Sequence, residues 1–198
     1  MNAAAAKVLR SDARSALSPM RSELEKNYFE LFGLPRQFPI DLSDLSSRYR
    51  ELQKKFHPDK YASRSEAERR MASQMAAQIN AAYQSLKSPL ERGRYLLRLS
   101  GIELNDEKDT KMNPAFLMEQ MELRERLEST NGANDPVAHL LDLGKEIDQM
   151  TTGRIKSLQE LFELSDRDSL TQARELLREM QFLEKFRKDI ENKEDDLV

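Results

Sequence analysis

The chain has 198 residues, a net charge of −3, no Cys and only two His, which excludes a disulfide framework, a thiolate metal site, a cysteine nucleophile and a histidine-rich metal site. Helix-forming residues dominate, Gly and Pro are few, and alternating β-branched runs are absent, so the sequence predicts an all-α protein. No apolar stretch approaches the length of a bilayer crossing, so we expect no membrane partner.

Residues 1–25 contain no aromatic residue and little apolar content, which is typical of a flexible N-terminal extension. Their basic and serine content also fits a mitochondrial transit peptide, although Asp12 and Glu23 count against that interpretation. Ordered structure is expected to begin near Tyr28, where a single apolar turn ends at Gly33.

Two amphipathic helices are expected next, and together they predict an antiparallel helical hairpin. Asp41 is the expected N-cap of the first helix, and Pro58 ends it because the residue before a proline is forced out of the α region. Ser65 is the expected N-cap of the second helix, with Glu68 completing a capping box. The expected buried stripes are Leu42, Leu45, Tyr49, Leu52 and Phe56 on the first helix, and Met71, Met75, Ile79, Ala82 or Tyr83, and Leu86 on the second.

The opposite face of the first helix is basic and carries Arg48, Arg50, Lys54 and Lys55. A short helix is expected to start at Ser88 and Pro89 and to end at Gly101. The sequence therefore predicts an N-terminal domain at residues 26–101, followed by a polar junction at residues 102–112.

Three further helices are expected in the C-terminal half. Asn113-Pro114 and Asp135-Pro136 each combine a capping side chain with a proline at the first helical position. The second of these helices is long and has a weak point at Thr151-Thr152-Gly153, where a kink is expected, and Asp168 is the expected cap of the last helix. We expect a three-helix bundle at residues 113–193 and a frayed tail at residues 194–198.

The tripeptide His57-Pro58-Asp59 lies between the two hairpin helices. A catalytic His needs a nucleophile and an orienting group within reach, and the sequence contains no Gly-rich phosphate loop, Gly-x-Ser-x-Gly elbow or useful carboxylate pair. We therefore expect neither enzymatic activity nor a cofactor. Taken in isolation, the tripeptide is explained by a proline that simply ends a helix. Because it lies beside a basic helix, however, the rigidly held His57 and Asp59 are better explained as part of a docking surface.

Charge is distributed unevenly along the chain. Residues 28–100 carry 13 Lys and Arg against 8 Asp and Glu, whereas residues 101–198 carry 14 against 24. A basic half joined to an acidic half indicates two surfaces for two partners. The acidic whole argues against nucleic acid as one of them.

Three segments resemble the J-domain family in order and spacing: YFELFGL at residues 28–34, HPDK at residues 57–60 and NAAYQSL at residues 80–86. The resemblance implies docking on a DnaK-type chaperone whose ATPase the domain stimulates, and it implies that Tyr83 packs inside the hairpin. The implied chaperone-binding residues are His57, Pro58, Asp59, Arg48, Arg50, Lys54 and Lys55.

Beyond that domain, SPLERGRYLL at residues 88–97, NPAFLMEQMELRE at residues 113–125 and MQFLEKF at residues 180–186 resemble the HscB family of J-type co-chaperones of iron–sulfur cluster biogenesis. The resemblance implies two partners, a specialised DnaK-like chaperone of the HscA type and a cluster scaffold of the IscU type. The implied scaffold-binding residues are Leu117, Met118, Met121, Glu122, Glu125 and Phe182.

Spacing supports the first five residues of this set, from Leu117 to Glu125. They are related by steps of three and four along the chain, and residues spaced in this way share one face of a helix. The alternative is that Leu117, Met118 and Met121 are bundle core, as most Met and Leu stripes are. The sequence alone favours this core alternative, although Phe116 and Leu123 offer another strip that could face the core and Glu122 and Glu125 border the stripe like a polar rim. With the resemblance included, we favour an interface.

Other functions remain open at this point. The chain could be a general J-protein that presents unfolded clients, although it lacks the Gly/Phe-rich linker and β-rich domain of most such proteins. A purely structural helical protein would make the His-Pro-Asp motif incidental, and a metalloenzyme or direct cluster carrier is disfavoured by the absence of Cys. Some eukaryotic members of the family that this chain resembles have a Cys-rich, zinc-binding N-terminal region, whereas this chain has no Cys. The resemblance therefore implies the bacterial type and the cytoplasm, or the mitochondrial matrix if residues 1–25 are a transit peptide.

Overall fold

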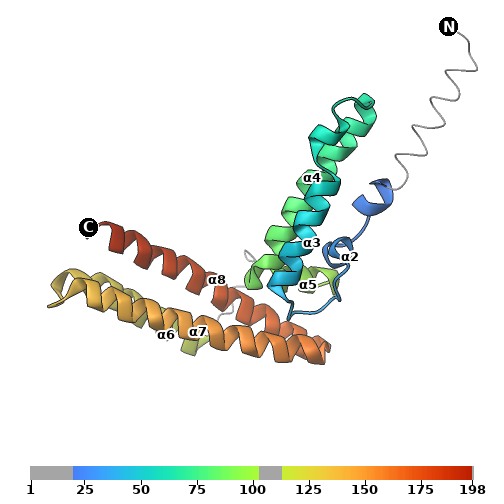
Figure 1. The fold of residues 1–198 in the computed structure, drawn as a ribbon. Helices are drawn as coiled ribbons and strands as arrows, with labels where there is room; N and C mark the ends of the chain where they lie inside the picture. Colours follow the sequence, from blue (N-terminus) through green and yellow to red (C-terminus); the bar gives the residue numbers. More distant parts are fainter. Residues whose placement is uncertain (1–19, 103–112, 198) are drawn as a thin grey trace, which may run out of the picture. The chain divides into compact units, whose positions relative to one another are not determined.

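The computed structural model describes residues 20–102 and 113–197, and within these ranges all regular structure is helical (Figure 1). The all-α prediction is therefore confirmed. The elements in chain order are α2 (Tyr28–Phe32), α3 (Leu42–Lys55), η1 (Pro58–Tyr61), α4 (Glu66–Lys87), α5 (Pro89–Leu99), α6 (Pro114–Glu128), η2 (Ser129–Gly132), α7 (Pro136–Leu164) and α8 (Arg167–Asp195).

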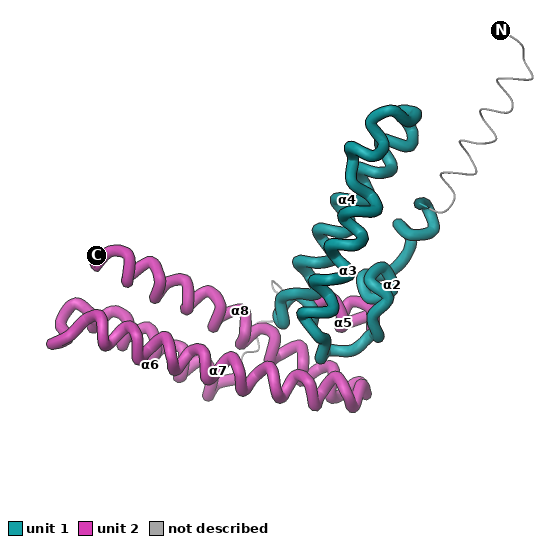
Figure 2. The backbone as a smooth tube through the Cα atoms, in the orientation of Figure 1, with its two compact units in different colours: residues 1–92 teal, residues 93–198 magenta. Residues whose placement is uncertain are grey.

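The chain divides into two compact units, residues 1–92 and residues 93–198, which Figure 2 distinguishes by colour. The dividing point lies inside α5, nine residues before the end that we predicted for the N-terminal domain at position 101. Most of the predicted junction at residues 102–112 lies outside the described residues.

The second half of α5 packs within the C-terminal unit, which explains this division. Arg94 donates a hydrogen bond of 2.7 Å to Gln181 of α8. A Cβ atom at Gly93 would lie 2.6 Å from a methyl carbon of the buried Leu177, so any larger residue here would have to displace that side chain.

The N-terminal unit contains ordered structure before Tyr28. Residues 20–24 form a helical turn, the Met20 side chain is buried, and the Gln78 amide of α4 donates a hydrogen bond of 3.1 Å to the Leu24 carbonyl. The structure corrects the expectation of a flexible segment for this part of the chain, because a long-range contact orders a stretch whose own composition is uninformative. Residues 1–19 of the predicted extension lie outside the described residues.

The short helix α2 ends as predicted. Gly33 has a left-handed φ of 61° and caps the helix through hydrogen bonds to the carbonyls of Glu30 and Phe29. The Arg48 guanidinium of α3 donates to the Phe32 and Gly33 carbonyls at 2.9 and 3.0 Å. The unpaired carbonyls at the end of α2 are thus satisfied by a side chain from the next helix.

Helices α3 and α4 form the predicted hairpin, and both predicted caps are present. Asp41 accepts hydrogen bonds from the Ser43 and Asp44 amides. Ser65 and Glu68 form a complete capping box, and the hydrogen bonds from Ser65 hold the pKa of Glu68 below its usual range.

The buried stripes of the hairpin differ from the prediction. On the first stripe Leu45 and Phe56 are buried, whereas Tyr49 and Leu52 are only partly buried. Leu42 is 49% exposed, and Met71 is only partly buried, whereas Ala72 is fully buried in its place. The stripe of α4 therefore starts one residue later, which keeps the spacing of three and four that a helix needs to meet one neighbour. The buried residues of α4 are Ala72, Met75, Ile79, Ala82 and Leu86.

The C-terminal unit is built on the pair α7 and α8, which lie side by side along their length (Figure 1). Asn113 and Asp135 cap α6 and α7 as predicted, at 3.0 Å to the Ala115 and Ala138 amides. Helix α7 is continuous through Gly153. The main hydrophobic core consists of Leu123, Leu140, Leu143, Ile147, Leu183, Phe186 and Ile190.

The start of α8 was predicted wrongly. Asp166, not Asp168, is the N-cap, and it accepts hydrogen bonds of 2.8 and 2.9 Å from the amide and hydroxyl of Ser169. Ser165 ends α7 in a left-handed conformation, so the first residue able to cap the next helix is Asp166. Helix α8 then runs to Asp195, two residues into the predicted tail.

Helix α6 has two unlike faces. Phe116, Gln120 and Leu123 are buried toward the unit. Met118 and Met121 on the other face are 64% and 65% exposed. Leu127, near the end of the helix, is partly buried against the core. The solvent-facing side of α6 therefore keeps an apolar stripe, which is typical of a surface that binds a partner.

We expect Ser65→Ala to lower the free energy of unfolding by about 1 kcal/mol, because the amide of Glu68 loses its capping oxygen. The lowered pKa means that Glu68 stabilises the folded state at neutral pH and loses this contribution as acid protonates it, so the effect should shrink at low pH. Urea unfolding followed by Tyr fluorescence measures this, because four of the five Tyr lie in the N-terminal unit and the chain has no Trp. Ser73→Ala, at an exposed site inside α4, is the control and should have no such effect.

Leu123→Ala should lower the free energy of unfolding of the C-terminal unit by about 2–5 kcal/mol, because Leu123 is 2% exposed in the core. Met121→Ala on the same helix should change it by less than about 0.5 kcal/mol. Urea unfolding followed by far-ultraviolet circular dichroism compares the two variants. Equal losses would show that the outer face of α6 is buried in solution.

Candidate functional site

The His57-Pro58-Asp59 segment is a short, rigid projection between α3 and α4. Pro58 begins η1, and His57 caps it: the His57 Nδ1 atom accepts a hydrogen bond of 3.3 Å from the Asp59 amide. The same Nδ1 lies 3.5 Å from the Asp59 carboxylate. Because Nδ1 accepts, the neutral imidazole carries its proton on Nε2, which is then a donor for a partner.

Both functional side chains of this segment face solvent. The His57 side chain is 53% exposed and the Asp59 side chain is 90% exposed. A carboxylate this open to water gains little electrostatic strength for catalysis, whereas it is fully accessible to a binding partner. The arrangement therefore suits docking better than chemistry.

The basic face of α3 divides into free and engaged side chains. Arg50, Lys54 and Lys55 are exposed, and the Lys55 ammonium lies 5.0 Å from the centre of the Phe56 ring. Arg48 instead pairs with Asp44 at 2.8 Å and caps α2, and its hydrogen bond to Asp44 raises the pKa of the guanidinium. The structure thus gives Arg48 a structural role that the sequence pattern did not reveal.

A polar and aromatic network fastens α3 to α4. The Tyr49 and Tyr83 rings stack with centroids 4.1 Å apart, which agrees with the expectation that Tyr83 packs inside the hairpin. The Tyr49 hydroxyl donates to Asn80 at 3.0 Å, and the Gln53 amide donates to the Tyr49 hydroxyl at 2.8 Å. Gln53 and Asn80 were not singled out from the sequence, although Asn80 lies in the NAAY segment.

The second candidate surface is the outer face of α6. Leu117, Met118 and Met121 are 48%, 64% and 65% exposed, and Glu122 and Glu125 beside them are exposed as well. The alternative that this stripe is core is therefore not seen in the structure. Apolar side chains gathered on one solvent-facing helix surface mark an interaction site.

Phe182 of α8 is joined to α6 by aromatic contacts. Its ring meets Phe116 edge-on at 5.7 Å and stacks on Phe186 at 5.6 Å, so it is half-buried. The Arg124 guanidinium of α6 lies 5.7 Å from the centre of the Phe182 ring. Arg124 is a neighbour that sequence reasoning missed, because its ring partner is 58 residues away.

Within residues 20–102 and 113–197, no helix is long and apolar enough to cross a membrane. The same residues hold no group of three His, Asp or Glu side chains placed to bind a metal ion.

Two family models match the chain. The DnaJ domain model matches residues 27–95, and the model described as the HSCB C-terminal oligomerisation domain matches residues 112–191. The first match contains the His-Pro-Asp projection, and the second contains α6, α7 and α8.

Named relatives match over most of their length. The Co-chaperone protein HscB homolog of Vibrio cholerae is 49% identical over 172 residues, which are 87% of this chain and 99% of that protein. The corresponding protein of Aliivibrio fischeri is 43% identical over the same length.

Solved structures agree with these matches. Chaperone HscB from Vibrio cholerae superposes with a TM-score of 0.79 at 47% identity, covering 87% of this chain and all of that one. Human co-chaperone HscB superposes with a TM-score of 0.78 at 31% identity, covering 85% of this chain and 82% of that one. On the sequence matches, the fold and the exposed His-Pro-Asp projection, the chain belongs to the HscB family of J-type co-chaperones.

Proposed function

We propose that the chain stimulates the ATPase of a DnaK-like chaperone of the HscA type and delivers an iron–sulfur cluster scaffold of the IscU type to it, in the bacterial cytoplasm. Scaffold delivery is supported above all by the exposure of Leu117, Met118 and Met121. A Met and Leu stripe of this kind is more often buried in a core. The HscB family membership supports the choice of both partners.

The N-terminal unit supplies the chaperone contact. Pro58 holds His57 and Asp59 in one geometry before binding, so little conformational entropy is lost when the chaperone docks. Arg50, Lys54 and Lys55 attract an acidic partner surface and raise the association rate. Arg48 contributes indirectly, because its bonds to Phe32 and Gly33 hold α2 against the start of the basic helix.

The C-terminal unit supplies the scaffold contact. Its apolar centre on α6 consists of exposed Leu and Met side chains, and Glu122 and Glu125 form a polar rim beside it. Phe182 adds an aromatic edge that is already fixed by Phe116 and Phe186, so it loses little freedom on binding. In this proposal the chain performs no bond chemistry, and ATP hydrolysis takes place on the chaperone.

Presentation of unfolded clients is the second candidate function. Met118 and Met121 are exposed and unbranched, and such side chains adapt to several partner shapes. A general client-presenting protein would bind many denatured proteins, whereas the proposed function requires one folded scaffold. A competition experiment separates the two functions: a denatured protein should displace the scaffold from the chain if the chain presents unfolded clients, and should not displace it under the proposed function.

His57→Gln should abolish stimulation of steady-state ATP hydrolysis by the HscA-type chaperone. Folding and scaffold binding should be unchanged, because the His57 ring makes only local contacts with Asp59 among the described residues. His139→Gln is the matched control at the other His of the chain; Gln can keep a hydrogen bond to the Arg126 carbonyl, and stimulation should persist. A fully active His57→Gln variant would refute the proposed docking role of the motif.

The double variant Leu117→Ala with Met118→Ala should weaken scaffold binding at least about tenfold, because truncating a central apolar anchor costs more than about 1 kcal/mol. It should also remove the synergy between scaffold and chain in the chaperone ATPase assay. Val137→Ala with Leu141→Ala is the matched control, since these α7 residues are 54% and 52% exposed. Calorimetric titration measures the binding, and equal losses in both double variants would contradict a specific α6 surface.

A further inference from the structure

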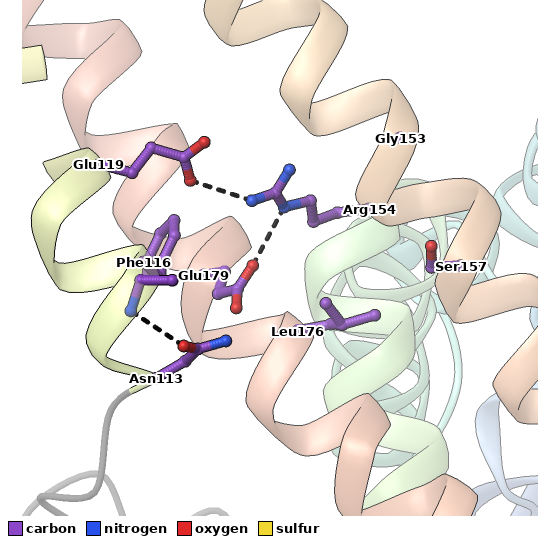
Figure 3. A pocket seen from close by; sticks show the side chains of 9 residues that line it. Asn113, Phe116, Glu119, Gly153, Arg154, Ser157, Leu176 and Glu179 are labelled. Carbon is purple, nitrogen blue, oxygen red and sulfur yellow. Dashed lines mark hydrogen bonds and ion pairs between the residues drawn. The ribbon is translucent and has the colours of Figure 1, made fainter.

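A pocket of about 520 Å³ lies beneath the start of α6, among α6, α7 and α8 (Figure 3). Arg154 of α7 points across it toward the other two helices. The residues that line the pocket are Asn113, Ala115, Phe116, Glu119, Gly153, Arg154, Ser157, Leu176 and Glu179.

One guanidinium joins the three helices. The Arg154 Nη2 donates to Glu119 of α6 at 3.1 Å, and its Nε donates to Glu179 of α8 at 3.0 Å (Figure 3). Its central carbon also lies 5.8 Å from the centre of the Phe116 ring. Two carboxylates already neutralise this cation, so the pocket offers no free positive charge to an anionic ligand.

The two carboxylates depend on Arg154. The Glu179 side chain is only 13% exposed, and burial raises its pKa while Arg154 opposes that rise. Without Arg154, Glu179 would be a poorly solvated carboxylate facing the like charge of Glu119. Repulsion would then favour movement of Glu119, and of the helix that carries it, away from α8.

The other polar contacts between α6 and α7 lie at the C-terminal end of α6, where Arg126 pairs with Glu146 at 2.7 Å and its carbonyl bonds the His139 ring at 2.9 Å. The buried face of α6 consists of Phe116, Gln120 and Leu123. Among the described residues, the buried Nε2 of Gln120 has no hydrogen-bond partner, so Gln120 adds no directional contact. The Arg154–Glu119 pair is thus the directional bond between α7 and the turn of α6 that carries Leu117 and Met118.

We infer that Arg154 is a positioning residue for scaffold binding: by bridging Glu119 and Glu179 it fixes the rotation of α6, and so presents Leu117, Met118 and Met121 together. This inference rests on the proposed scaffold-binding function. Arg154 itself is 24% exposed, and its contacts are with Glu119, Glu179 and the Phe116 ring on the inner side of α6 and α8. Its effect on binding therefore passes through α6.

The test is calorimetric titration of the IscU-type scaffold into Arg154→Met, Arg154→Lys and Glu119→Gln. Arg154→Met should weaken binding about tenfold, and Arg154→Lys should lie between it and the unmodified chain, because an ammonium lacks the planar fork that reaches both carboxylates. Lys156→Met, two residues along α7 at an exposed position, is the control and should bind normally. Should Arg154→Met fail to fold by circular dichroism, Glu119→Gln at a 38% exposed side chain carries the same test.

The decisive measurement is the scaffold affinity of a triple variant that combines Arg154→Met with Leu117→Ala and Met118→Ala. In the Leu117→Ala, Met118→Ala background, Arg154→Met should cause no further loss of affinity, since the face that it positions is already gone. A further loss as large as in the unmodified chain would overturn the positioning role. Normal binding by Arg154→Met, with weak binding by the Leu117→Ala, Met118→Ala variant, would also overturn the positioning role. That result would leave the proposed scaffold surface intact. Normal binding by the Leu117→Ala, Met118→Ala variant would instead refute the proposed scaffold surface and this inference with it.

Discussion

Burial of an apolar stripe between two antiparallel helices is the interaction on which each unit of the chain depends. In the N-terminal unit the pair is α3 and α4, and in the C-terminal unit it is α7 and α8. A fully buried Leu or Ile contributes about 1.5–3 kcal/mol, whereas an exposed ion pair contributes about 0–1 kcal/mol. The stripes therefore decide the fold, and the many charged pairs on the surface do not.

Because these helix pairs bury most of the apolar side chains that stabilise each unit, other parts of the unit can face solvent without loss of stability. In the N-terminal unit one such part is the projection at His57, Pro58 and Asp59, which the hairpin holds at one end (Figure 1). In the C-terminal unit it is the outer face of α6, a helix that buries only three of its side chains. Under the proposed function, stability and recognition therefore rest on different side chains, and a binding surface can change without loss of the core.

The polar contacts of an arginine gain importance where the side chain is buried. Arg154 is one quarter exposed and bridges two carboxylates across three helices, and it lies against an aromatic ring as well. Arg92 in the N-terminal unit is more deeply buried; burial lowers its pKa to about 10, and it donates to the Leu86 carbonyl at 2.6 Å beside the Phe38 ring. In both cases one guanidinium combines charge, directional hydrogen bonds and stacking, which a lysine cannot do.

The features that the sequence by itself determined are local ones. The caps at Asp41, Ser65, Asn113 and Asp135 and the stop at Gly33 were predicted correctly, because a cap depends on side chains within four residues. The exposed motif at His57 was also evident, since Pro58 constrains its own neighbours. The face of α6 that points outward was favoured on the strength of spacing and resemblance together.

Tertiary structure decided what depends on distant neighbours. The order of residues 20–24 rests on Gln78, the role of Arg48 rests on the end of α2, and the Arg154 bridge joins residues 25 and 35 positions away. The cap was misplaced at Asp168 because Ser165 ends α7 in a left-handed conformation, which makes Asp166 the first residue able to cap α8. Leu42 was misassigned because the apolar spacing continues to the start of α3, where the side chain is 49% exposed. Periodicity states which residues share a face, whereas only packing states which face has a partner.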